Sequence, residues 1–320
     1  MIKKIGVLTS GGDAPGMNAA IRGVVITGIK LGIEMFGIKN GFLGLYENRI
    51  QKLNVLNVSN IINKGGTFLG TSRFPKFKKK VNRIIAIKNL QKKNIDALVV
   101  IGGDGSYVGA QKLSSMGLSC VSIPSTIDND IVGTDYTIGY YTALETIVKS
   151  IDKIRDTSYS HNRIAIVEIM GRKCGHLTLL SSIAAGCEFL IIPETKIEKE
   201  KIVINIMKKL NKNKKSFIIV ITENLYNVKN LAKYIEKKTK KETRATILGH
   251  VQRGGSPVVY DRVLATRMSS YAVKILIHGW SGRCIGIRNE KIVHSDIEKS
   301  LNKRKKNSTQ YWLNLSKKLC

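Results

Sequence analysis

The chain has 320 residues, 43% hydrophobic and 24% charged, a composition typical of a globular protein long enough for about two domains. Its 53 Lys and Arg outnumber 23 Asp and Glu to give a net charge of +30, and its five cysteines show no C-x-x-C pair or nearby His spacing. These patterns exclude a disulfide or metal framework, and without a long apolar run or signal-like N-terminus we expect a soluble cytoplasmic protein without a membrane partner.

Short apolar runs rich in Val and Ile recur along the chain, at residues 5–8, 97–101, 120–123, 164–169, 189–192, 217–221 and 245–248. Longer segments of helical character separate them, among them 17–30, 107–116, 141–154 and 199–210. Nearly continuous apolar strands that alternate with helices are typical of a parallel sheet covered on both faces. The sequence therefore predicts an α/β fold with mostly parallel sheets.

Glycine-rich and acidic segments follow three of the predicted strands. The strand at 5–8 leads into SGGDAPG at 10–16, the strand at 97–101 into GGDGS at 102–106, and the strand at 120–123 into PSTIDND at 124–130. Because ligands of α/β proteins bind beyond the carboxyl ends of strands, we expect these three segments to meet at one site.

The three segments differ in how specific they are. The turn at 10–16 fits neither the dinucleotide nor the Walker pattern, so it is either architecture or an anion site at a helix N-terminus. The segment at 102–106 offers backbone without side chains for a polyphosphate, and Asp104 offers a carboxylate for Mg²⁺. Asp128 and Asp130 belong either to an ordinary polar turn or to phosphoryl transfer, which needs a carboxylate to accept a hydroxyl proton.

Basic residues gather near strand boundaries in the second half of the chain. Arginine forks suit a phosphate monoester, although an arginine taken alone is more often a surface or salt-bridged residue. Together with an acidic residue after the run at 217–221, they predict a sugar-phosphate pocket. The set is Arg163, Met170, Gly171, Arg172, Glu223, Arg244, His250 and Arg253.

Residues 11–18, 102–106, 126–130, 170–172 and 249–257 match, in order and spacing, the characteristic segments of the bacterial ATP-dependent 6-phosphofructokinases. The chain resembles this family over essentially its whole length. The resemblance implies two Rossmann-like lobes in a homotetramer. Residues 1–138 plus 251–300 would form the ATP-binding lobe, and 139–250 plus 301–320 the fructose 6-phosphate-binding lobe. The implied reaction transfers the γ-phosphoryl group of MgATP to the 1-hydroxyl of fructose 6-phosphate.

The resemblance also implies roles for individual residues. Asp128 would accept the proton, Asp104 would bind Mg²⁺, and Arg163 and Arg244 would reach in from a neighbouring subunit. Arg73 would bridge the transferring phosphate and the sugar, and Arg172 would stabilise charge on the phosphoryl oxygens. The catalytic set is Asp128, Arg172, Thr126, Arg73 and Gly12. The ATP-binding set is Gly12, Arg73, Phe74, Gly103, Asp104, Gly105 and Ser106. The substrate-binding set is Thr126, Ile127, Asp128, Arg163, Met170, Gly171, Arg172, Glu223, Arg244, His250 and Arg253.

Two positions bear on the phosphoryl donor. Pyrophosphate-dependent members of the family carry bulkier residues where this chain has Gly105 and Ser125. Ser125 departs from the glycine typical of the ATP enzymes, yet it is small and is not the lysine of the pyrophosphate enzymes. We expect ATP as the donor.

An effector site for ADP or phosphoenolpyruvate is implied by the same resemblance, at Arg22, Arg155, Gly186, Cys187, Glu188, Lys212, Lys214 and Lys215. However, Ile26, Val55 and Leu56 stand where relatives carry two further arginines and an aromatic partner. Each charge-assisted phosphate contact contributes roughly 1.5 to 3 kcal/mol, so effector binding is expected to be tens-fold to thousands-fold weaker.

The sequence leaves three other interpretations: a kinase of the diacylglycerol or NAD kinase type, which also carries a Gly-Gly-Asp-Gly segment, a basic nucleic-acid-binding protein, and a kinase that has decayed to a structural subunit. The lysines lie in segments such as 76–80 and 237–241 without the interleaved aromatic residues of a base-stacking surface. We therefore expect no nucleic-acid partner, and we expect the charge to favour encounter with phosphorylated metabolites.

Overall fold

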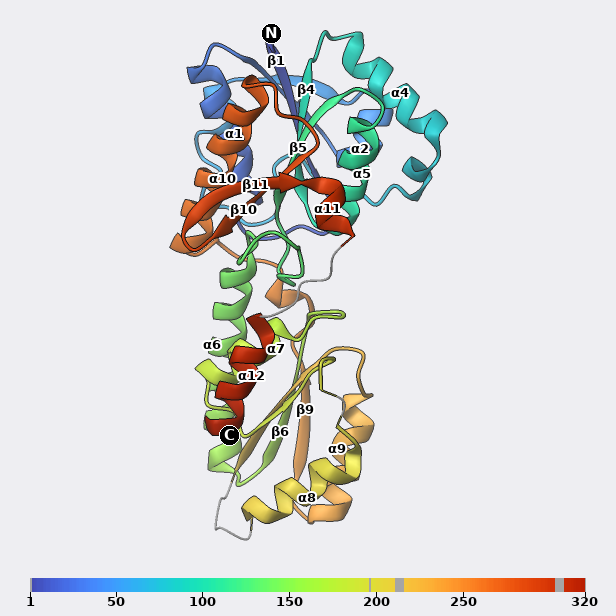
Figure 1. Ribbon diagram of the computed structural model, residues 1–320. Coiled ribbons are helices and arrows are strands. Elements are labelled where there is room, and N and C mark those ends of the chain that lie inside the picture. The colour runs from blue at the N-terminus through green and yellow to red at the C-terminus, as the bar shows by residue number, and fades with distance from the viewer. Residues whose placement is uncertain (1, 196, 211–215, 303–307, 320) are drawn as a thin grey trace. The chain divides into compact units, whose positions relative to one another are not determined.

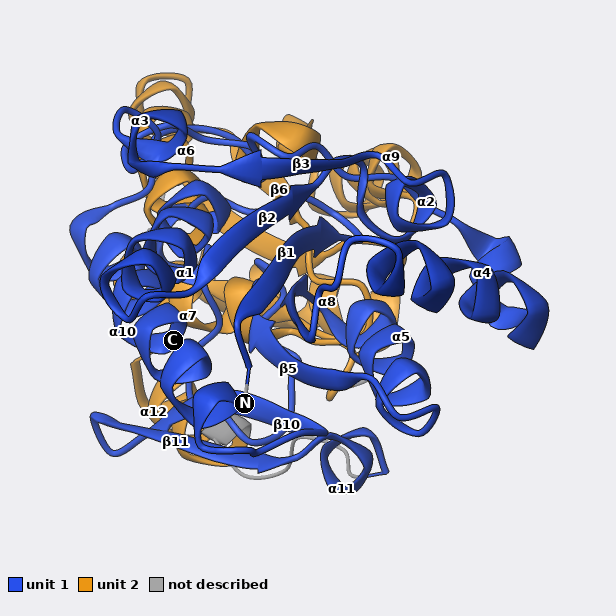
Figure 2. Cartoon of the chain, turned by 90° about the horizontal axis from the view of Figure 1, so that it is seen from above, with its two compact units in different colours: residues 1–142, 253–305 blue, residues 143–252, 306–320 orange. Residues whose placement is uncertain are grey.

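In the computed structural model, which describes residues 2–195, 197–210, 216–302 and 308–319, the chain divides into two compact units (Figures 1 and 2). Unit 1 comprises residues 1–142 and 253–305, and unit 2 comprises 143–252 and 306–320. The first boundary falls inside helix α6 (Tyr140–Ser160), four residues beyond the expected position, because a continuous helix carries no sequence signal for a change of unit.

Unit 1 contains a seven-stranded sheet in the order β11-β10-β5-β4-β1-β2-β3. Its five inner strands run parallel, whereas the edge strands β3 and β11 pair antiparallel with β2 and β10. The strands are β1 (Lys4–Ser10), β2 (Glu34–Ile38), β3 (Ile50–Leu53), β4 (Ala97–Gly102), β5 (Ser119–Pro124), β10 (Arg283–Arg288) and β11 (Lys291–Asp296).

Helices cover both faces of this sheet (Figure 1). On one face α1 (Met17–Lys30) packs against α10 (Val259–Ile277), closely enough that a Cβ at Gly23 would lie 2.7 Å from Ser269 Cβ. On the other face α2 (Gly41–Tyr46), α4 (Lys80–Gln91) and α5 (Asp104–Ser114) bury Leu98 and Val100 of β4. The shorter helices of the unit are α3 (Val55–Val58), η1 (Pro75–Lys78) and α11 (Ile297–Leu301).

Unit 2 contains a four-stranded parallel sheet in the order β7-β8-β6-β9. Its strands are β6 (Ile164–Ile169), β7 (Phe189–Ile191), β8 (Phe217–Thr222) and β9 (Thr243–Ile247). Helices α8 (Lys199–Leu210) and α9 (Val228–Thr239) pack on one face over Ile166 and Ile219. The remaining helices are α6, α7 (His176–Ala184), α12 (Ser308–Leu319) and the one-turn η2 (Gly249–Gln252), and Leu179 of α7 packs against Leu313 of α12.

The predicted α/β class with mostly parallel sheets is confirmed, and each of the seven predicted strands is present within a few residues. Helix α5 begins at Asp104 rather than 107, since Gly103 is an extended N-cap and an acidic residue is favourable in a first helical turn. None of the helices in the described ranges has the length and apolarity needed to cross a membrane.

Candidate active site

The three glycine-rich and acidic segments of unit 1 begin at the same level of the sheet. Strands β1, β4 and β5 are neighbours, and the ladder pairs Ser10 with Gly102 and Gly102 with Pro124. The segments at 10–16, 102–106 and 124–130 therefore leave adjacent parallel strands side by side. This register confirms the expected convergence of the three segments and follows from their common place at the carboxyl ends of strands.

The turn at 10–16 owes its shape to glycines. Gly16, with φ 102°, is the N-cap of α1, and a Cβ there would lie 2.6 Å from Ile138 Cγ2. At Gly12 a Cβ would overlap the guanidinium of Arg253, whose Nη2 donates to the Asp13 carbonyl at 3.2 Å. The structure thus places Arg253 on the glycine turn of unit 1.

The segment at 102–106 has the features of an anion site. Asp104 and Gly105 are exposed at the first turn of α5, and a side chain built at Gly105 would meet no heavy atom within 4 Å. Ser106 is buried, and its hydroxyl donates to the Ser10 carbonyl at 2.9 Å, which ties this segment to the glycine turn. The positive end of the helix dipole at this N-terminus suits a phosphate.

The donor set fits Mg²⁺ bound together with substrate phosphates. Within the described ranges no three His, Cys, Asp or Glu residues group closely enough to hold a metal by themselves. Mg²⁺ is usually bound through one or two carboxylates, with waters and substrate phosphates completing its octahedron. The exposed carboxylate of Asp104 suits that arrangement.

The segment at 124–130 carries Asp128 in a nearly buried position. Asp128 is 8% exposed, and the Asp128 backbone N–H donates to Thr126 Oγ1 at 3.3 Å. Thr126 also faces the anion segment, since a Cβ at Gly103 would lie 3.7 Å from Thr126 Cβ. Ile127 is 2% exposed and anchors the segment in the core.

Arg73 and Phe74 precede η1 in the same unit. Arg73 is exposed. The Phe74 ring packs between Tyr46 and Phe77, with ring centroids 5.2 and 6.1 Å away, at the margin of the core under α2 and α4. Phe74 therefore presents only part of its ring to a ligand.

Unit 2 carries a second set of predicted site residues at strand ends. The ladder pairs Glu168 of β6 with both Ile221 of β8 and Ile247 of β9, so the residues that follow these strands start at one level. Arg172 adopts a left-handed conformation, with φ 55°, and is exposed at the tip of its turn. His250 is exposed in η2.

Two side chains hold the turn at 170–172 in place. Glu223 Oε1 accepts from the N–H groups of Gly171 and Arg172 at 3.2 and 3.0 Å, and Gln252 Oε1 accepts from Met170 N–H at 3.1 Å. Burial, followed by the nearby charge of Glu223, raises the pKa of Glu168. Within this chain Glu223 therefore holds the backbone of the turn that carries Arg172.

Arg163 and Arg244 share one carboxylate within the chain. Glu242 accepts from Arg163 Nε at 2.5 Å and pairs with Arg244 Nη2 at 2.5 Å, and these two bonds lower its pKa. Arg244 lies in the edge strand β9 and is largely exposed, and Arg163 directly precedes the neighbouring strand β6. The role of Arg163 and Arg244 toward a neighbouring subunit stays a prediction.

The predicted effector residues are only partly brought together. In unit 2 Arg155 donates to the carbonyls of Ala185 and Gly186, at 2.5 and 3.2 Å, and its Nη1 lies 3.7 Å from Glu188. Arg22 lies in unit 1. Cys187, which follows Gly186, is 2% exposed. The predicted members Lys212, Lys214 and Lys215 lie outside the described residues.

Sequence inspection missed the residues that position these loops. These residues are Gln252, Asn129 and Asp261, and all three are fully buried. Their side chains accept hydrogen bonds from the backbone N–H groups of Met170, Thr137 and Gly139, respectively. Asn129 stands beside Asp128 and has a positive φ of 51°, which an Asn in an acidic turn could have suggested. Asp261 carried no signal, because its partners are more than 100 residues away in the sequence.

Two mostly parallel sheets with glycine turns, an exposed carboxylate at a helix N-terminus and arginines at strand ends define an α/β protein with the features expected for phosphate chemistry. The family model described as phosphofructokinase matches residues 4–276. The chain belongs to the phosphofructokinase family.

Individual relatives agree with this assignment. The chain is 63% identical to the ATP-dependent 6-phosphofructokinase of Buchnera aphidicola subsp. Schizaphis graminum and 58% identical to that of Serratia proteamaculans, over 100% of both chains in each case. Its fold matches the structure of phosphofructokinase from Saccharomyces cerevisiae with a TM-score of 0.86 and 35% identity. That match covers 99% of this chain and 46% of the yeast chain.

Proposed function

We propose that this chain is an ATP-dependent 6-phosphofructokinase, which transfers the γ-phosphoryl group of MgATP to the 1-hydroxyl of fructose 6-phosphate. The observation that carries the proposal is the common register of β1, β4 and β5, which sets the Asp104 segment beside the segment that carries Asp128. Full-length identity of about 60% to enzymes with this activity supports it.

Unit 1 contributes the donor site and the base. The glycine turn and the first turn of α5 would bind the phosphates of ATP, with Gly12, Arg73, Phe74 and the residues at 103–106 in contact. Bound Mg²⁺, held through Asp104, would neutralise charge on the transferring phosphoryl group. Asp128 would take the proton of the attacking hydroxyl, a step for which a fixed carboxylate is suited because phosphoryl transfer depends on positioning more than on covalent chemistry.

Unit 2 contributes groups for the sugar phosphate. Glu223 and the turn at 170–172 would contact the sugar, while Arg172 would stabilise charge on the phosphoryl oxygens. His250 would contact the sugar phosphate, and Arg253, although it lies on the glycine turn, keeps its proposed role in substrate binding. The carboxylate of Glu242, shared by Arg163 and Arg244, supports a preformed pair of guanidinium groups, which in a homotetramer would serve a neighbouring subunit.

The assembly and surroundings follow from the same proposal. The enzyme would act as a homotetramer in the cytoplasm, with ATP and fructose 6-phosphate as its small-molecule partners and no nucleic-acid or membrane partner. The described cysteines, Cys120, Cys174, Cys187 and Cys284, are not in disulfides, as a reducing compartment favours.

Control by ADP or phosphoenolpyruvate is proposed to be weak. Val55 is 47% exposed and Leu56 81% exposed, where a phosphate-binding surface would carry charge. Titrating each effector against the fructose 6-phosphate saturation curve should move the half-saturation point little. The double variant Ile26→Arg with Val55→Arg should increase the response to ADP, and a large shift in the unmodified chain at low effector concentration would refute the proposal.

The assigned base is tested by Asp128→Asn. Turnover with MgATP should fall by several orders of magnitude, since removal of a catalytic base costs about 10²–10⁴-fold or more, while fructose 6-phosphate binding changes little. The matched control is Asp96→Asn. Asp96 precedes β4, at the strand end away from the site, and accepts from the N–H groups of Lys3 and Lys4. Near-normal turnover of Asp128→Asn would remove Asp128 from the mechanism.

A further inference from the structure

The segment that carries Asp128 belongs to no helix or strand, yet it is almost entirely buried. Asn129, Thr137 and Ile138 are 0% exposed, and Asp128 is 8% exposed. Such a segment needs partners for its backbone polar groups, because an unpaired buried N–H or C=O is costly. Those partners come from the stretch of chain that returns past it at 135–138.

Asn129 is the centre of this arrangement. Its side-chain Oδ1 accepts from Thr137 N–H at 3.1 Å, and its Nδ2 donates to the Asp135 carbonyl at 3.1 Å. One carboxamide thus replaces the two backbone bonds that a sheet would have supplied. The left-handed backbone at Asn129, with φ 51°, is a conformation that Asn tolerates better than most residues.

Thr137 closes the loop from the other side. Its hydroxyl donates to the Thr126 carbonyl at 2.6 Å, and the neighbouring Ile138 carbonyl accepts from Thr126 N–H at 3.1 Å. Thr126 Oγ1 in turn accepts from Asp128 N–H. The position of the Asp128 backbone is therefore set by Thr126 on one side and Asn129 on the other.

We propose that Asn129 and Thr137 are positioning residues that clamp the loop at 126–137 and so hold Asp128 at the distance from the acceptor hydroxyl that proton transfer requires. This inference rests on the proposed function, since it assumes that Asp128 is the base. Neither residue touches a reacting group by this account. Their contribution is geometric, and a displacement of about 1 Å at a reacting centre can cost on the order of 10²-fold in rate.

Asn129→Gly removes the carboxamide while allowing the left-handed backbone. We expect kcat to fall by about 10- to 100-fold, with the KM for MgATP little changed because the segment at 102–106 is untouched. The matched control is Asn89→Ala, since Asn89 is also buried and its Nδ2 donates to the carbonyls of Leu45 and Tyr46 at 3.0 and 2.8 Å. This control should lower Tm to a similar extent and leave kcat near the wild-type value.

Thr137 offers a second test that does not depend on whether Asn129→Gly folds. Thr137→Val keeps the shape of the side chain and removes the hydroxyl, so kcat should fall about tenfold or more. Thr137→Ser keeps the hydroxyl and should restore most of the rate. Equal rates for the Val and Ser variants would overturn the inference.

Asp128→Asn, measured in the same assay, separates the two claims. If Asp128→Asn is inactive while Asn129→Gly and Thr137→Val keep the wild-type kcat, the clamp is refuted and the proposed function stands. If Asp128→Asn is fully active, the proposed base has failed and the clamp fails with it. If Asn129→Gly lowers kcat no more than Asn89→Ala does, Asn129 contributes only to stability and the clamp is refuted.

Discussion

At the scale of single residues, the donor site depends on where side chains are missing. A Cβ at Gly12 would displace the Arg253 guanidinium, which lies in that space, whereas Gly105 faces open space at the first turn of α5. Ser125, the departure from the family's usual glycine, is fully buried, and its hydroxyl lies 3.5 Å from the Ile138 carbonyl. We expect Ser125 to be a tolerated change, because its side chain is turned into the protein.

Gly105→Asp tests the room left for the donor. A carboxylate at this position would repel the phosphates of ATP, and one like charge a few ångströms away costs roughly 1 to 4 kcal/mol near a protein surface. The KM for MgATP should rise about tenfold or more, with the KM for fructose 6-phosphate and Tm little affected. Gly105→Ala is the matched control, since its methyl group would meet no neighbour. An unchanged KM for MgATP in Gly105→Asp would mean that the nucleotide lies elsewhere.

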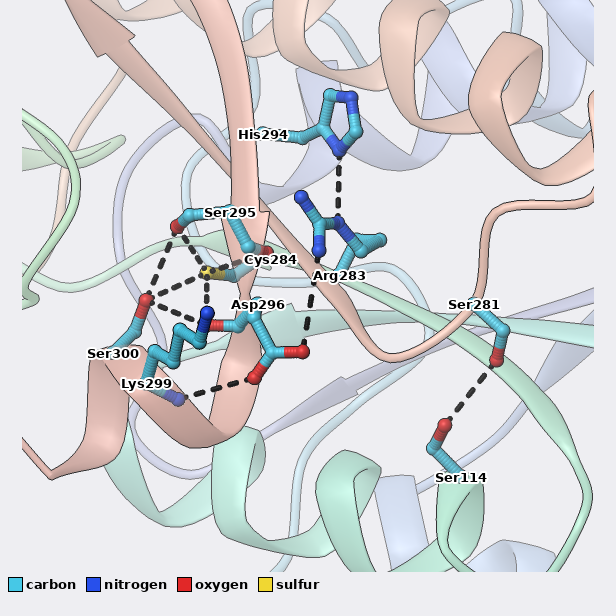
Figure 3. Close-up of polar contacts among 9 residues, drawn as sticks. All are labelled: Ser114, Ser281, Arg283, Cys284, His294, Ser295, Asp296, Lys299 and Ser300. Carbon is cyan, nitrogen blue, oxygen red and sulfur yellow. Dashed lines mark hydrogen bonds and ion pairs between the residues drawn. The ribbon is translucent and has the colours of Figure 1, made fainter.

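At the scale of elements, the hairpin of β10 and β11 contains a contact between an arginine and a histidine (Figure 3). Arg283 Nε donates to His294 Nδ1 at 2.9 Å, and Arg283 Nη1 lies 3.9 Å from Asp296. The His294 ring also packs edge-on against Trp280, 5.1 Å away between centroids, and beside Tyr271 at 5.9 Å. Partial burial, and then the charge of Arg283, lower the pKa of His294 below its ordinary value of 6.5.

The sign of the resulting pH dependence follows from linkage. Because His294 takes up a proton at lower pH in the folded chain than in the unfolded chain, the unfolded state binds more protons in the range just below pH 6.5. The free energy of unfolding should therefore decrease as the pH falls through that range. His294→Asn should flatten this dependence, whereas replacing the exposed His161 by Asn should not. An equally steep dependence in His294→Asn, measured by urea unfolding, would exclude His294 as its source.

The elements also show what the sequence could and could not predict. Strands β1, β4, β5, β6 and β8 are buried along their whole length or nearly so, and such apolar runs are visible in a sequence. Among the missed strands, β3 and β11 lie at the sheet edges and are partly exposed, whereas β2 and β10 are inner strands whose apolar runs are interrupted by Gly37 and Gly286. Exposed edge strands are stabilised by ladder bonds to a neighbour, which local composition does not reveal.

Site residues divide in the same way. Asp104, Asp128 and Arg172 stand in glycine-rich or acidic segments directly after strands, so their place could be predicted. Asn129, Gln252 and Asp261 act through partners brought near by the fold. Asp261 shows this most clearly: it is fully buried, and it bonds Gly139 N–H at 2.9 Å and Thr142 N–H at 2.8 Å, at the start of α6. Burial raises its pKa despite these bonds.

At the scale of the whole molecule, the charge of +30 is compatible with the proposed reaction, because both substrates are anions. The basic residues are spread along the whole sequence, and several form ion pairs with carboxylates, such as Lys52 with Glu34 and Arg49 with Glu47. Long-range attraction of this kind acts on encounter and is screened by salt. It does not identify a nucleic-acid partner.

The central claim is that the whole chain catalyses ATP-dependent phosphorylation of fructose 6-phosphate. The most direct test is the initial rate of fructose 1,6-bisphosphate formation by the purified protein, with Mg²⁺ and with either ATP or pyrophosphate as donor. We predict formation with ATP and none above background with pyrophosphate. Formation with pyrophosphate alone would contradict the inference, drawn from Gly105 and Ser125, that ATP is the donor. No formation with either donor would contradict the proposed function.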